Sequence, residues 1–533
     1  MSERGLIGKS LSDPGPERLI ERAPSGVTAF IGRTLKGPLD SPVCIGSFAH
    51  FERIFGGLWQ PSTLSYAIEQ FFENGGQRAI VVRVANGAKA PTLSLAAGRD
   101  ELCLNGVNPG SREYLRAAVD YDGIDGEPDR FNLVLQRVRA PGTQQIEDQE
   151  IYRRVSIEPG SARFVGDLLH GSRLMRVRGR APTARPDPTS GPGRAGSYVS
   201  CRLDGDDGAP LSDYDVIGSA AKSTGLWALQ SQLDFDLVCI PPLARDTDVG
   251  LATLYVAGCF CRDHRAMLLV DPPSPWTTAE RALIGFRSWP FRSENAVMFY
   301  PRLTAYDRLR RRPEIFGSAA AAAGLLARQD MAVPVWAPTE AQELILRPGV
   351  KPAVDVEDSL RVRLSQAGIN TLLAARSSDA PRLVPCTLAG SATGSSEWRH
   401  LGARRLAMYV VSSIERAMRW LASAENDLLT WSRAQCEVER FLEELHREGA
   451  FAGGRPQDSY FVICDERVNR RDTVAEGKMH LLFGIATARP AEFHAWLVTY
   501  QGAVTRVRPT TVNRLATSPE RVDWEIETSI LRG

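Results

Sequence analysis

The sequence lacks most of the features that identify an enzyme. It contains neither a G-x-S-x-G nucleophile elbow nor an H-E-x-x-H zinc-binding pattern, and its seven histidines are scattered along 533 residues. Scattered histidines nominate no general base, although a site built from paired carboxylates would leave no mark in a sequence. We therefore expect no enzymatic activity, no catalytic residue and no cofactor.

An excess of charge and long apolar runs are also missing. The formal net charge is only +1, with 24% charged residues, so the chain has no field suited to nucleic acid. The longest run of small apolar residues, 319–327, is about half of what a bilayer span needs. The first residues lack the apolar segment of a secretory signal. We expect no nucleic-acid partner, no membrane insertion and folding in the cytoplasm.

The nine cysteines are odd in number and irregularly spaced, which favours buried, reduced thiols over a disulfide framework. Cys259, Cys261 and His264 lie within six residues, but zinc sites need a second ligand pair that the sequence does not offer. We expect helix-packed thiols with a surface histidine. Residues 204–215 have the composition of a calcium loop, but their glycine falls at the fifth position, and we expect a solvated turn.

Two further stretches resemble binding motifs only in part. "GLIGKS" at 5–10 ends like a phosphate loop, but Glu3 occupies the position where that loop needs its first glycine. The six arginines between 171 and 194 have no aromatic residue among them to stack on bases, so we expect a solvated loop there.

The clearest patterns in the sequence indicate secondary structure and its order along the chain. Residues 27–32 alternate as a strand does, and the helix that follows is expected to end at Asn74-Gly75-Gly76. Residues 79–84 are rich in β-formers, so the whole stretch predicts a β-α-β unit. From 88 to 232 the periodicity weakens, with 176–196 the strongest linker-like segment. Apolar runs at 235–240 and 266–270 predict buried parallel strands.

The last third predicts two long helices against a small sheet. Apolar residues repeat at helical spacing from 406 to 421 and again from 427 to 448, where Asn426 is expected to cap the second helix. Three β-rich runs follow, at 460–464, 480–487 and 492–500.

Several of these stretches together resemble the contractile tail sheath family of contractile phages, R-type bacteriocins and extracellular contractile injection systems. "GVTAFIGRTLKGPLDSPVCIGSFAHFERIFGGLWQPSTLSYAIEQFFENGGQRAIVVRV" is similar to the opening of these proteins. "CRDHRAMLLVDPP", "NAVMFYPRL" and "SQAGIN" are similar to their middle portion, and "EWRHLGARRLAMYVVSSIERAMRWL" and "SYFVICDE" to their last portion, in the same order.

The resemblance implies a multidomain fold, α/β and α+β, with a discontinuous sheath core of a mixed sheet with flanking helices and a large inserted outer domain. The implied parts are an N-terminal arm (1–25), the first part of the core (26–87), a variable outer insertion (88–232), an α/β middle domain (233–345), a C-terminal sheath domain (346–506) and a C-terminal extension (507–533).

It also implies a structural subunit that polymerises as stacked hexameric rings around an inner tube and contracts to drive the tube through a target envelope. The partners would be other copies, the inner tube protein, and baseplate and cap proteins. The particle, a phage tail or an extracellular phage tail-like particle, would be assembled in the cytoplasm of the producing bacterium. The short arm before Val27 and the segment after Gln501 leave open a non-contracting adaptor or cap near the baseplate or tail terminus.

Neighbouring subunits of the family share β-strands, and its C-terminal domain lies against the tube. We therefore expect inter-subunit strands at Val27, Ala29, Ile31, Ala495, Leu497, Thr499 and Val504. The residues expected to face the inner tube are Arg433, Glu437, Arg440, Arg467, Arg470, Arg471 and Lys478. No metal site is expected, and an enzyme built on the α/β layer would require a carboxylate-lined pocket between 235 and 340.

Overall fold

The computed structural model describes residues 19–189, 197–232, 234–337, 344–374, 381–389, 397–502, 504–516 and 522–526. The chain divides into two compact units. The larger comprises Gly26–Ala332 and Gln342–Ala392, and the smaller comprises Met1–Ser25, Val333–Ala341 and Thr393–Gly533. Most of the arm, with its GLIGKS stretch, and parts of the 176–196 linker and the C-terminal extension lie outside the described residues.

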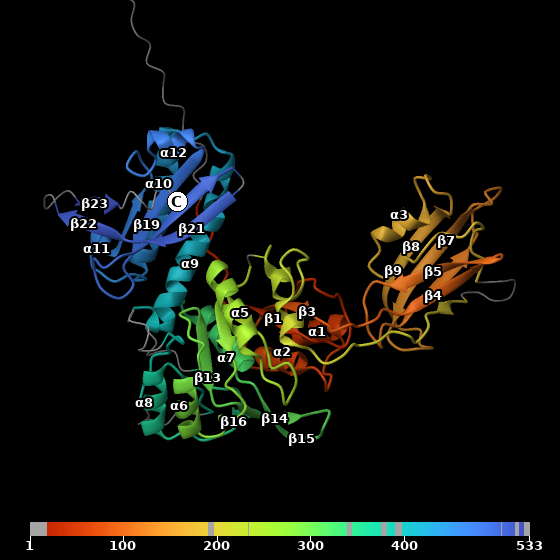
Figure 1. The fold of residues 1–533 in the computed structure, drawn as a ribbon, viewed down its shortest axis with the longest axis horizontal. Helices are drawn as coiled ribbons and strands as arrows, with labels where there is room; N and C mark the ends of the chain where they lie inside the picture. Colours follow the sequence, from red (N-terminus) through yellow and green to blue (C-terminus); the bar gives the residue numbers. More distant parts are fainter. Residues whose placement is uncertain are drawn as a thin grey trace, which may run out of the picture. The chain divides into compact units, whose positions relative to one another are not determined.

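The larger unit is built on a seven-stranded mixed sheet (Figure 1). Six of its strands are parallel, and β2 alone runs antiparallel, against β3. The order across the sheet is β17 (Asn370–Thr371), β13 (Ala296–Tyr300), β12 (Met267–Val270), β11 (Leu237–Cys239), β1 (Val27–Gly32), β3 (Arg78–Arg83) and β2 (Val43–Ile45).

Both faces of this sheet are covered by helices, which is why its strands read as continuous apolar runs rather than alternating ones. Helices α5 (Leu251–Asp263), α6 (Ala279–Ser288) and α8 (Asp358–Ala367) share one core with the outward residues of one face, such as Ile31 and Met298. Helices α2 (Thr63–Glu73) and α7 (Ala319–Ala332) cover the other face, where the Phe71 ring packs edge-on against Phe30 at 5.3 Å.

The β-α-β unit expected between 27 and 84 is present. Ser62 caps α2 by accepting a hydrogen bond from the Ser65 amide, and the helix ends at Asn74. Gly75 follows with φ +109°, and a Cβ there would lie 2.8 Å from the Arg328 side chain, so a glycine is required on both counts. Helix α1 (Phe48–Phe55) precedes α2 and ends at Gly56.

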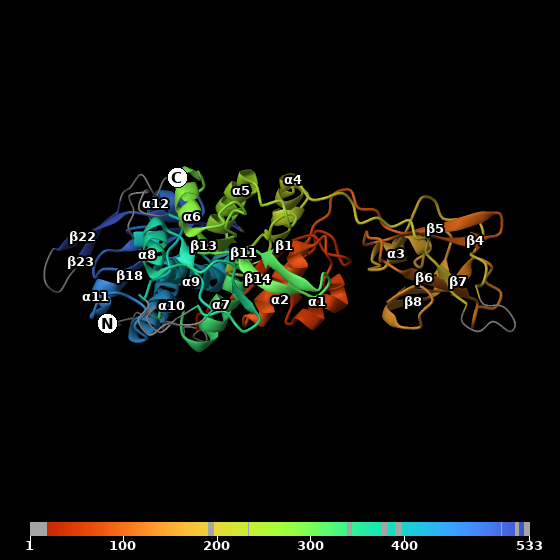
Figure 2. The same cartoon turned by 90° about the horizontal axis from the view of Figure 1, so that it is seen from below.

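Val216 and Leu229, near the end of the weakly periodic segment 88–232, belong to the core of the seven-stranded sheet. The residues of this segment from Leu93 to Cys201 share a core of their own (Figure 2). Two antiparallel sheets contribute alternate apolar residues such as Leu93 and Leu133 to that core. Their strands are β4 (Thr92–Ala97), β5 (Asp100–Gly106) and β9 (Met175–Val177) in one, and β10 (Val199–Ser200), β6 (Leu115–Asp120), β7 (Arg130–Val138) and β8 (Ile146–Ser156) in the other. Short helices α3 (Val165–His170) and α4 (Asp213–Ile217) and the 3-10 turn Gly225–Leu229 complete the segment.

A three-stranded antiparallel sheet follows β13. Its order is β15 (Arg312–Phe316), β14 (Leu303–Asp307) and β16 (Val350–Pro352). Strand β16, α8 and β17 belong to the larger unit, and β17 extends the parallel sheet beyond β13, whereas the sequence joins this region to the C-terminal domain.

The smaller unit packs two long helices on a four-stranded antiparallel sheet. The strands, in spatial order, are β18 (Tyr460–Ile463), β19 (Lys478–Ile485), β20 (His494–Gln501) and β21 (Val504–Thr510). The helices are α9 (Leu401–Ala417) and α10 (Leu428–Arg447), joined by the 3-10 turn Met418–Ser423. The shorter elements are the 3-10 turn Glu397–Arg399, α11 (Pro456–Ser459), α12 (Arg471–Ala475) and the hairpin strands β22 (Val512–Ala516) and β23 (Val522–Ile526).

One local expectation for this unit needs correction. The cap of α10 is Asp427, whose carboxylate accepts the Thr430 amide at 2.8 Å, whereas Asn426 donates to the Lys478 carbonyl and accepts from the Trp431 indole. The end of the N-terminal arm also contacts this unit, since the Ala23 amide donates to Ser413 Oγ at 2.9 Å and Ile20 packs on the helix core.

Candidate assembly surfaces

The first expected inter-subunit strand lies in the middle of a sheet. Val27, Ala29 and Ile31 are in β1, which pairs with β3 along its whole length and with β11 on the opposite side. All six residues of β1 are buried. Both hydrogen-bonding edges of β1 are therefore used inside the chain. No edge of β1 is open for the expected pairing of these three residues with a neighbouring subunit.

The second group lies at or beside an open edge. Ala495, Leu497 and Thr499 are in β20, which has β19 on one side and β21 on the other. Val504 is the first residue of β21, where it is 53% exposed. Since β21 is the last of the described strands in this sheet, it is the member of this group with no strand on its outer side among the described residues.

Pro509 determines which backbone groups point outward from β21. It lies opposite Trp496 on β20 and has no N–H. Pro509 and Trp496 therefore form a non-hydrogen-bonded pair of the antiparallel ladder. Because the two kinds of pair alternate, Val507 and Thr505 also direct their N–H and C=O groups away from β20. The outer edge thus offers the N–H groups of Thr505 and Val507, followed by Pro509, which has none. An added strand can therefore pair with β21 over only a few residues.

The opposite edge of the sheet is shorter and more occupied. In β18 the Tyr460 amide donates to the Pro456 carbonyl, and the next outward amide beyond the strand, at Cys464, donates to Gln435 Oε1 at 3.1 Å. Helix α10 also packs beside this strand. β21 is therefore the better candidate for pairing with another chain.

Side-chain composition also marks β21 as an edge strand. Its sequence VTRVRPT carries Arg506, Arg508 and Pro509, while Val507 packs on the helix core of the unit. Charged residues and proline on an edge prevent indiscriminate pairing with other strands. The edge is open only to a partner whose register and side chains match.

The expected tube-facing residues on α10 are partly inward. Glu437 is only 8% exposed and accepts from Arg433 Nε at 2.9 Å. The Arg433 guanidinium also lies over the Trp420 ring, 4.6 Å from its centroid. Arg433 and Glu437 thus link α10 to the preceding turn, and Arg440 lies half-buried one turn further along the same helix.

The turn 465–478 holds the other expected residues. Arg467 forms a two-point ion pair with Asp465, with the shortest contact 2.6 Å, and Lys478 pairs with Glu476 at 3.0 Å. These pairs hold the shape of the turn. Arg470 and Arg471 are exposed at the start of α12, where they project basic side chains from the surface.

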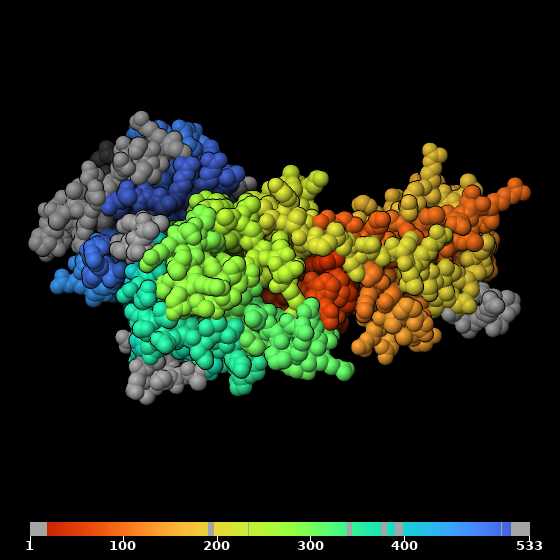
Figure 3. Space-filling model, turned by 60° about the horizontal axis from the view of Figure 1, so that its bottom comes forward, coloured from red at the N-terminus to blue at the C-terminus, as the bar shows by residue number. Residues whose placement is uncertain are grey.

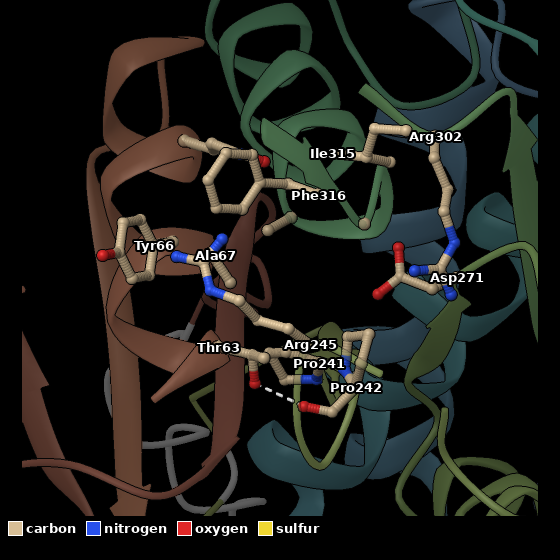
Figure 4. Close-up of a pocket in the computed structure, with 13 residues that line it drawn as sticks. Thr63, Tyr66, Ala67, Pro241, Pro242, Arg245, Asp271, Arg302, Ile315 and Phe316 are labelled. Carbon is tan, nitrogen blue, oxygen red and sulfur yellow. Dashed lines mark hydrogen bonds between the residues drawn. The ribbon is translucent and has the colours of Figure 1, made fainter. Parts of the chain in front are cut away.

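The larger unit contains a pocket of the kind that an enzyme would require (Figure 4). It opens beyond the carboxyl ends of β11 and β12, where ligands bind in many α/β proteins. Tyr66, Arg245 and Phe316 lie toward one end, and Asp271 with Arg302 toward the other. Burial raises the pKa of Asp271.

The charged groups of this pocket are engaged in holding the fold. Asp271 accepts the Ala319 amide at 2.8 Å and thereby caps the start of α7. The Arg245 guanidinium lies 4.5 and 4.9 Å from the centroids of the Tyr66 and Phe316 rings, which stack on each other, and it pairs with the fully buried Asp307 at 2.6 Å. Among the lining residues, no nucleophile adjoins a base.

The cysteines and the acidic turn have local structural roles. None of the nine cysteines forms a disulfide, and five are buried, but Cys44, Cys259 and Cys436 are exposed, which corrects the expectation of buried thiols. His264 stacks on Phe260 with ring centroids 3.9 Å apart. Within the described ranges, no group of three or more His, Cys, Asp or Glu residues could hold a metal ion.

The acidic turn at 204–207 uses its carboxylates on neighbouring backbone and hydroxyl groups. Asp204 accepts from Thr92 and Asp207 from Ser111, each at the amide and the hydroxyl. In the part of the chain that the structure describes, no helix combines the length and apolarity needed to cross a bilayer.

Comparison of the sequence with protein-family models and with curated proteins finds no match. Comparison of the structure with solved structures finds contractile sheath proteins. The chain matches the sheath of the PVC extracellular contractile injection system in its contracted state with a TM-score of 0.51 at 15% identity, over 92% of this chain and 97% of that one. It matches the contracted helical sheath of the anti-feeding prophage with a TM-score of 0.51 at 18% identity, over 92% and 98%.

The sheath tail protein of Listeria innocua gives a TM-score of 0.58 at 13% identity, over 90% of this chain and 95% of that one. The expected resemblance is therefore confirmed at the level of the fold: the chain has the fold of contractile tail sheath proteins. Within that class, its neighbours include sheaths of extracellular injection systems that form helical assemblies.

Proposed function

We propose that this chain is the structural subunit of a contractile tail sheath, which polymerises as stacked hexameric rings around an inner tube and contracts to drive the tube through a target envelope. The observation that carries this is the sheath fold itself, which extends over 92% of the chain and nearly all of two contracted sheath subunits. The neighbours are structural proteins, which supports a role without enzymatic activity.

Strand addition at β21 is the proposed link between subunits. An added strand would pair with the outward groups of Thr505 and Val507, and the connection would persist while subunits rotate because it is made by backbone hydrogen bonds. A contact between two different surfaces of the same chain builds a helix when its rotation does not close a ring. This arrangement suits a tubular polymer with two lattice geometries.

Contraction would need no bound nucleotide in such a polymer. If the extended lattice is metastable, each subunit need release only a few kcal/mol on reaching the compact lattice, because every copy contributes. The energy would be stored in contacts between copies during assembly. Triggering then lowers a kinetic barrier, and the tube is carried forward.

The partners follow from this role. They are other copies of the chain, an inner tube protein, and baseplate and cap proteins. Arg470 and Arg471 are the proposed tube contacts, since they are exposed and basic. Residues 88–232 would face outward, and the particle would be assembled in the bacterial cytoplasm as part of a phage tail or an extracellular tail-like particle.

Electron microscopy of the purified chain with its tube protein tests this function. We expect helical sheaths around the tube, and a shorter, wider form after treatment with guanidinium or acid. A chain that stays monomeric with the tube present, at concentrations where known sheaths polymerise, would contradict the proposal.

A non-contracting adaptor or cap is the second candidate. It is favoured by the match to a chain of the anti-feeding prophage baseplate, with a TM-score of 0.51 at 17% identity, and by the hairpin β22–β23 that follows the edge strand. In that case the same preparation would give single rings that do not grow with concentration. Removal of residues 511–533 would then convert rings into tubes if the hairpin blocks addition.

A further inference from the structure

The hairpin formed by β14 and β15 projects from the larger unit, and hydrogen bonds hold it next to its turn (Figure 1). Asp307, at the end of β14, is fully buried and accepts from Tyr66 OH at 3.1 Å, from Arg245 at 2.6 Å and from the Leu309 amide at 2.8 Å. These bonds fix the tip of the hairpin to α2 and to the loop after β11. A partner that binds this hairpin would lose little entropy in ordering it.

The outer face of the hairpin is apolar and exposed. The register places Thr304 opposite Ile315 and Tyr306 opposite Pro313 on this face, while Leu303 faces the core. Tyr306 and Ile315 are each 59% exposed. In the space-filling view the green hairpin stands out from the surface (Figure 3). Exposed aromatic and aliphatic side chains next to arginines have the composition of a protein-binding surface.

The turn of the hairpin carries more positive charge than its own carboxylates neutralise. Arginines occupy four of the five positions 308–312, the densest basic run in the chain. Arg308 pairs with Glu69 and Glu73, whereas Arg310 and Arg312 share the single carboxylate of Glu314. Among the described residues the exposed Arg311 side chain has no ion-pair partner.

The opposite charge gathers in one loop of the 88–232 segment. Residues 120–129 contain five carboxylates and no basic residue, and no other stretch of ten residues contains as many acids. Asn132 braces this loop by donating to Asp120 Oδ1 at 2.7 Å and to the Asp122 carbonyl at 3.0 Å. Asp122 and Asp125 are exposed, and within the described ranges neither forms an ion pair.

We propose that the β14–β15 hairpin of one copy docks on residues 120–129 of a neighbouring copy, with Arg310 and Arg311 facing Asp122 and Asp125. The two surfaces differ, so the contact is heterologous and repeats through an open polymer instead of closing a dimer. This docking presupposes that the chain assembles as proposed above. It gives the 88–232 segment a role in the lattice, and its charge pairs weaken as salt rises.

Charge exchange tests the contact. The variants are Arg310→Glu with Arg311→Glu, Asp122→Lys with Asp125→Lys, and all four together, and the matched control is Arg281→Glu with Arg287→Glu on the exposed side of α6. Each exchange alone should raise the concentration needed for assembly with the tube about tenfold, as measured by sedimentation. The fourfold variant should return to the level of the unchanged chain, and the control should assemble normally.

The outcomes separate the docking from the proposed function. If the unchanged chain assembles and the hairpin variant does so equally well, the docking is wrong and the sheath function stands. If the fourfold variant is no better than either exchange, the two surfaces do not meet. If the unchanged chain fails to assemble with the tube, the proposed function fails first.

Cross-linking distinguishes a contact between two copies from a contact within one copy. Arg311→Cys and Asp125→Cys are placed in separate copies of different tagged mass, with the exposed Cys44, Cys259 and Cys436 replaced by serine. A bifunctional maleimide should join the two masses in assembled particles and not in dilute monomers. If one chain carrying both cysteines cross-links internally as a monomer and the mixed pair never joins, the proposal is overturned.

Discussion

Strands β1 and β21 come from the two segments expected to pair with neighbouring subunits, and they have opposite environments. β1 has a hydrogen-bonded partner on each side and no exposed residue. Within the described residues, β21 has a strand partner on one side only, and its residues are exposed or half-buried. A strand position near the start or end of a chain does not by itself predict an assembly role. The number of free hydrogen-bonding edges on a strand is the better guide to whether it can pair with a neighbouring subunit.

The sequences of the two strands already differ in the relevant way. VTAFIG has no charge and no proline, as a strand buried on both faces requires, whereas VTRVRPT has two arginines and a proline. The first sequence suits the interior of a sheet and the second suits its edge. Substitutions that act on one strand and not on the other test whether the two strands differ in this way.

The largest expected effect is on β1. Phe30 is fully buried and packs edge-on against Phe71, so Phe30→Ala should lower the free energy of unfolding of the larger unit by about 3–5 kcal/mol. Phe30→Leu keeps most of the volume and should cost under about 1.5 kcal/mol. Urea unfolding followed by circular dichroism measures both. Normal stability with a loss of assembly would mean that β1 does pair with neighbours.

A buried carboxylate beside the closed sheet gives the next effect. Burial raises the pKa of Glu69 to about 7, although Arg308 opposes this, so the folded chain binds the proton more tightly than the unfolded chain does. Stability should therefore be greatest near pH 4.5 and fall, by about 1–3 kcal/mol, as the pH rises to about 7.

Glu69→Gln should remove that part of the pH dependence, and Glu73→Gln, one helical turn further along α2, should not. Urea midpoints measured between pH 5 and pH 8 provide the check. An unchanged pH profile in Glu69→Gln would show that this carboxyl is ionised normally.

On β21 the expected effect falls on assembly and not on the monomer. Thr505→Pro removes an amide that points away from β20, so the free energy of unfolding should change by less than about 0.5 kcal/mol. An added strand would lose one hydrogen bond and leave a carbonyl unpaired, worth about 1–3 kcal/mol per subunit. Sedimentation should show that tubes are lost at concentrations where Thr505→Val still forms them. Full-length tubes from Thr505→Pro would exclude pairing at this edge.

Much of the fold can be predicted from the sequence because periodicity and end signals act locally. The expected runs at 235–240 and 266–270 contain β11 and β12, and the two long helices begin and end within a few residues of α9 and α10. The Asn74-Gly75-Gly76 stop is where α2 ends. In each case the pattern of one buried face and the residue at one end of the element are enough to predict the element.

The remainder depends on contacts between distant segments. The choice of Asp427 over Asn426 as the cap of α10 follows from Trp431 and Lys478, which occupy the Asn426 side chain. The pairing of β1 with β11 joins residues more than 200 positions apart, and no local pattern announces it. Within 88–232, the residues from Leu93 to Cys201 form two sheets around one core. Their periodicity is weak because the strands are irregular and the turns are long, so the sequence does not reveal this core.

The candidate surfaces could be predicted only as far as their segments. Arg433 and Glu437 are correctly placed on a helix, but the sequence does not reveal that they pair with each other and that Glu437 is buried. The outward amides of β21 follow from the position of Pro509, which the sequence contains but whose meaning depends on the strand register. The basic hairpin at 308–312 was missed, although four arginines in five residues are a visible signal.

The smallest expected effect distinguishes the tube contact from the strand contact in the same unit. Arg470→Glu with Arg471→Glu should weaken binding to the tube by about 1 kcal/mol or less per residue, because exposed ion pairs are weak. The fold should be unaffected, since both positions lie at the start of α12, where an acidic residue interacts favourably with the helix dipole. Cosedimentation with the tube at two salt concentrations measures the change. The matched variant Lys478→Gln, at a residue already paired with Glu476, should bind normally, and equal losses in both would mean that the turn acts through its shape and not its charge.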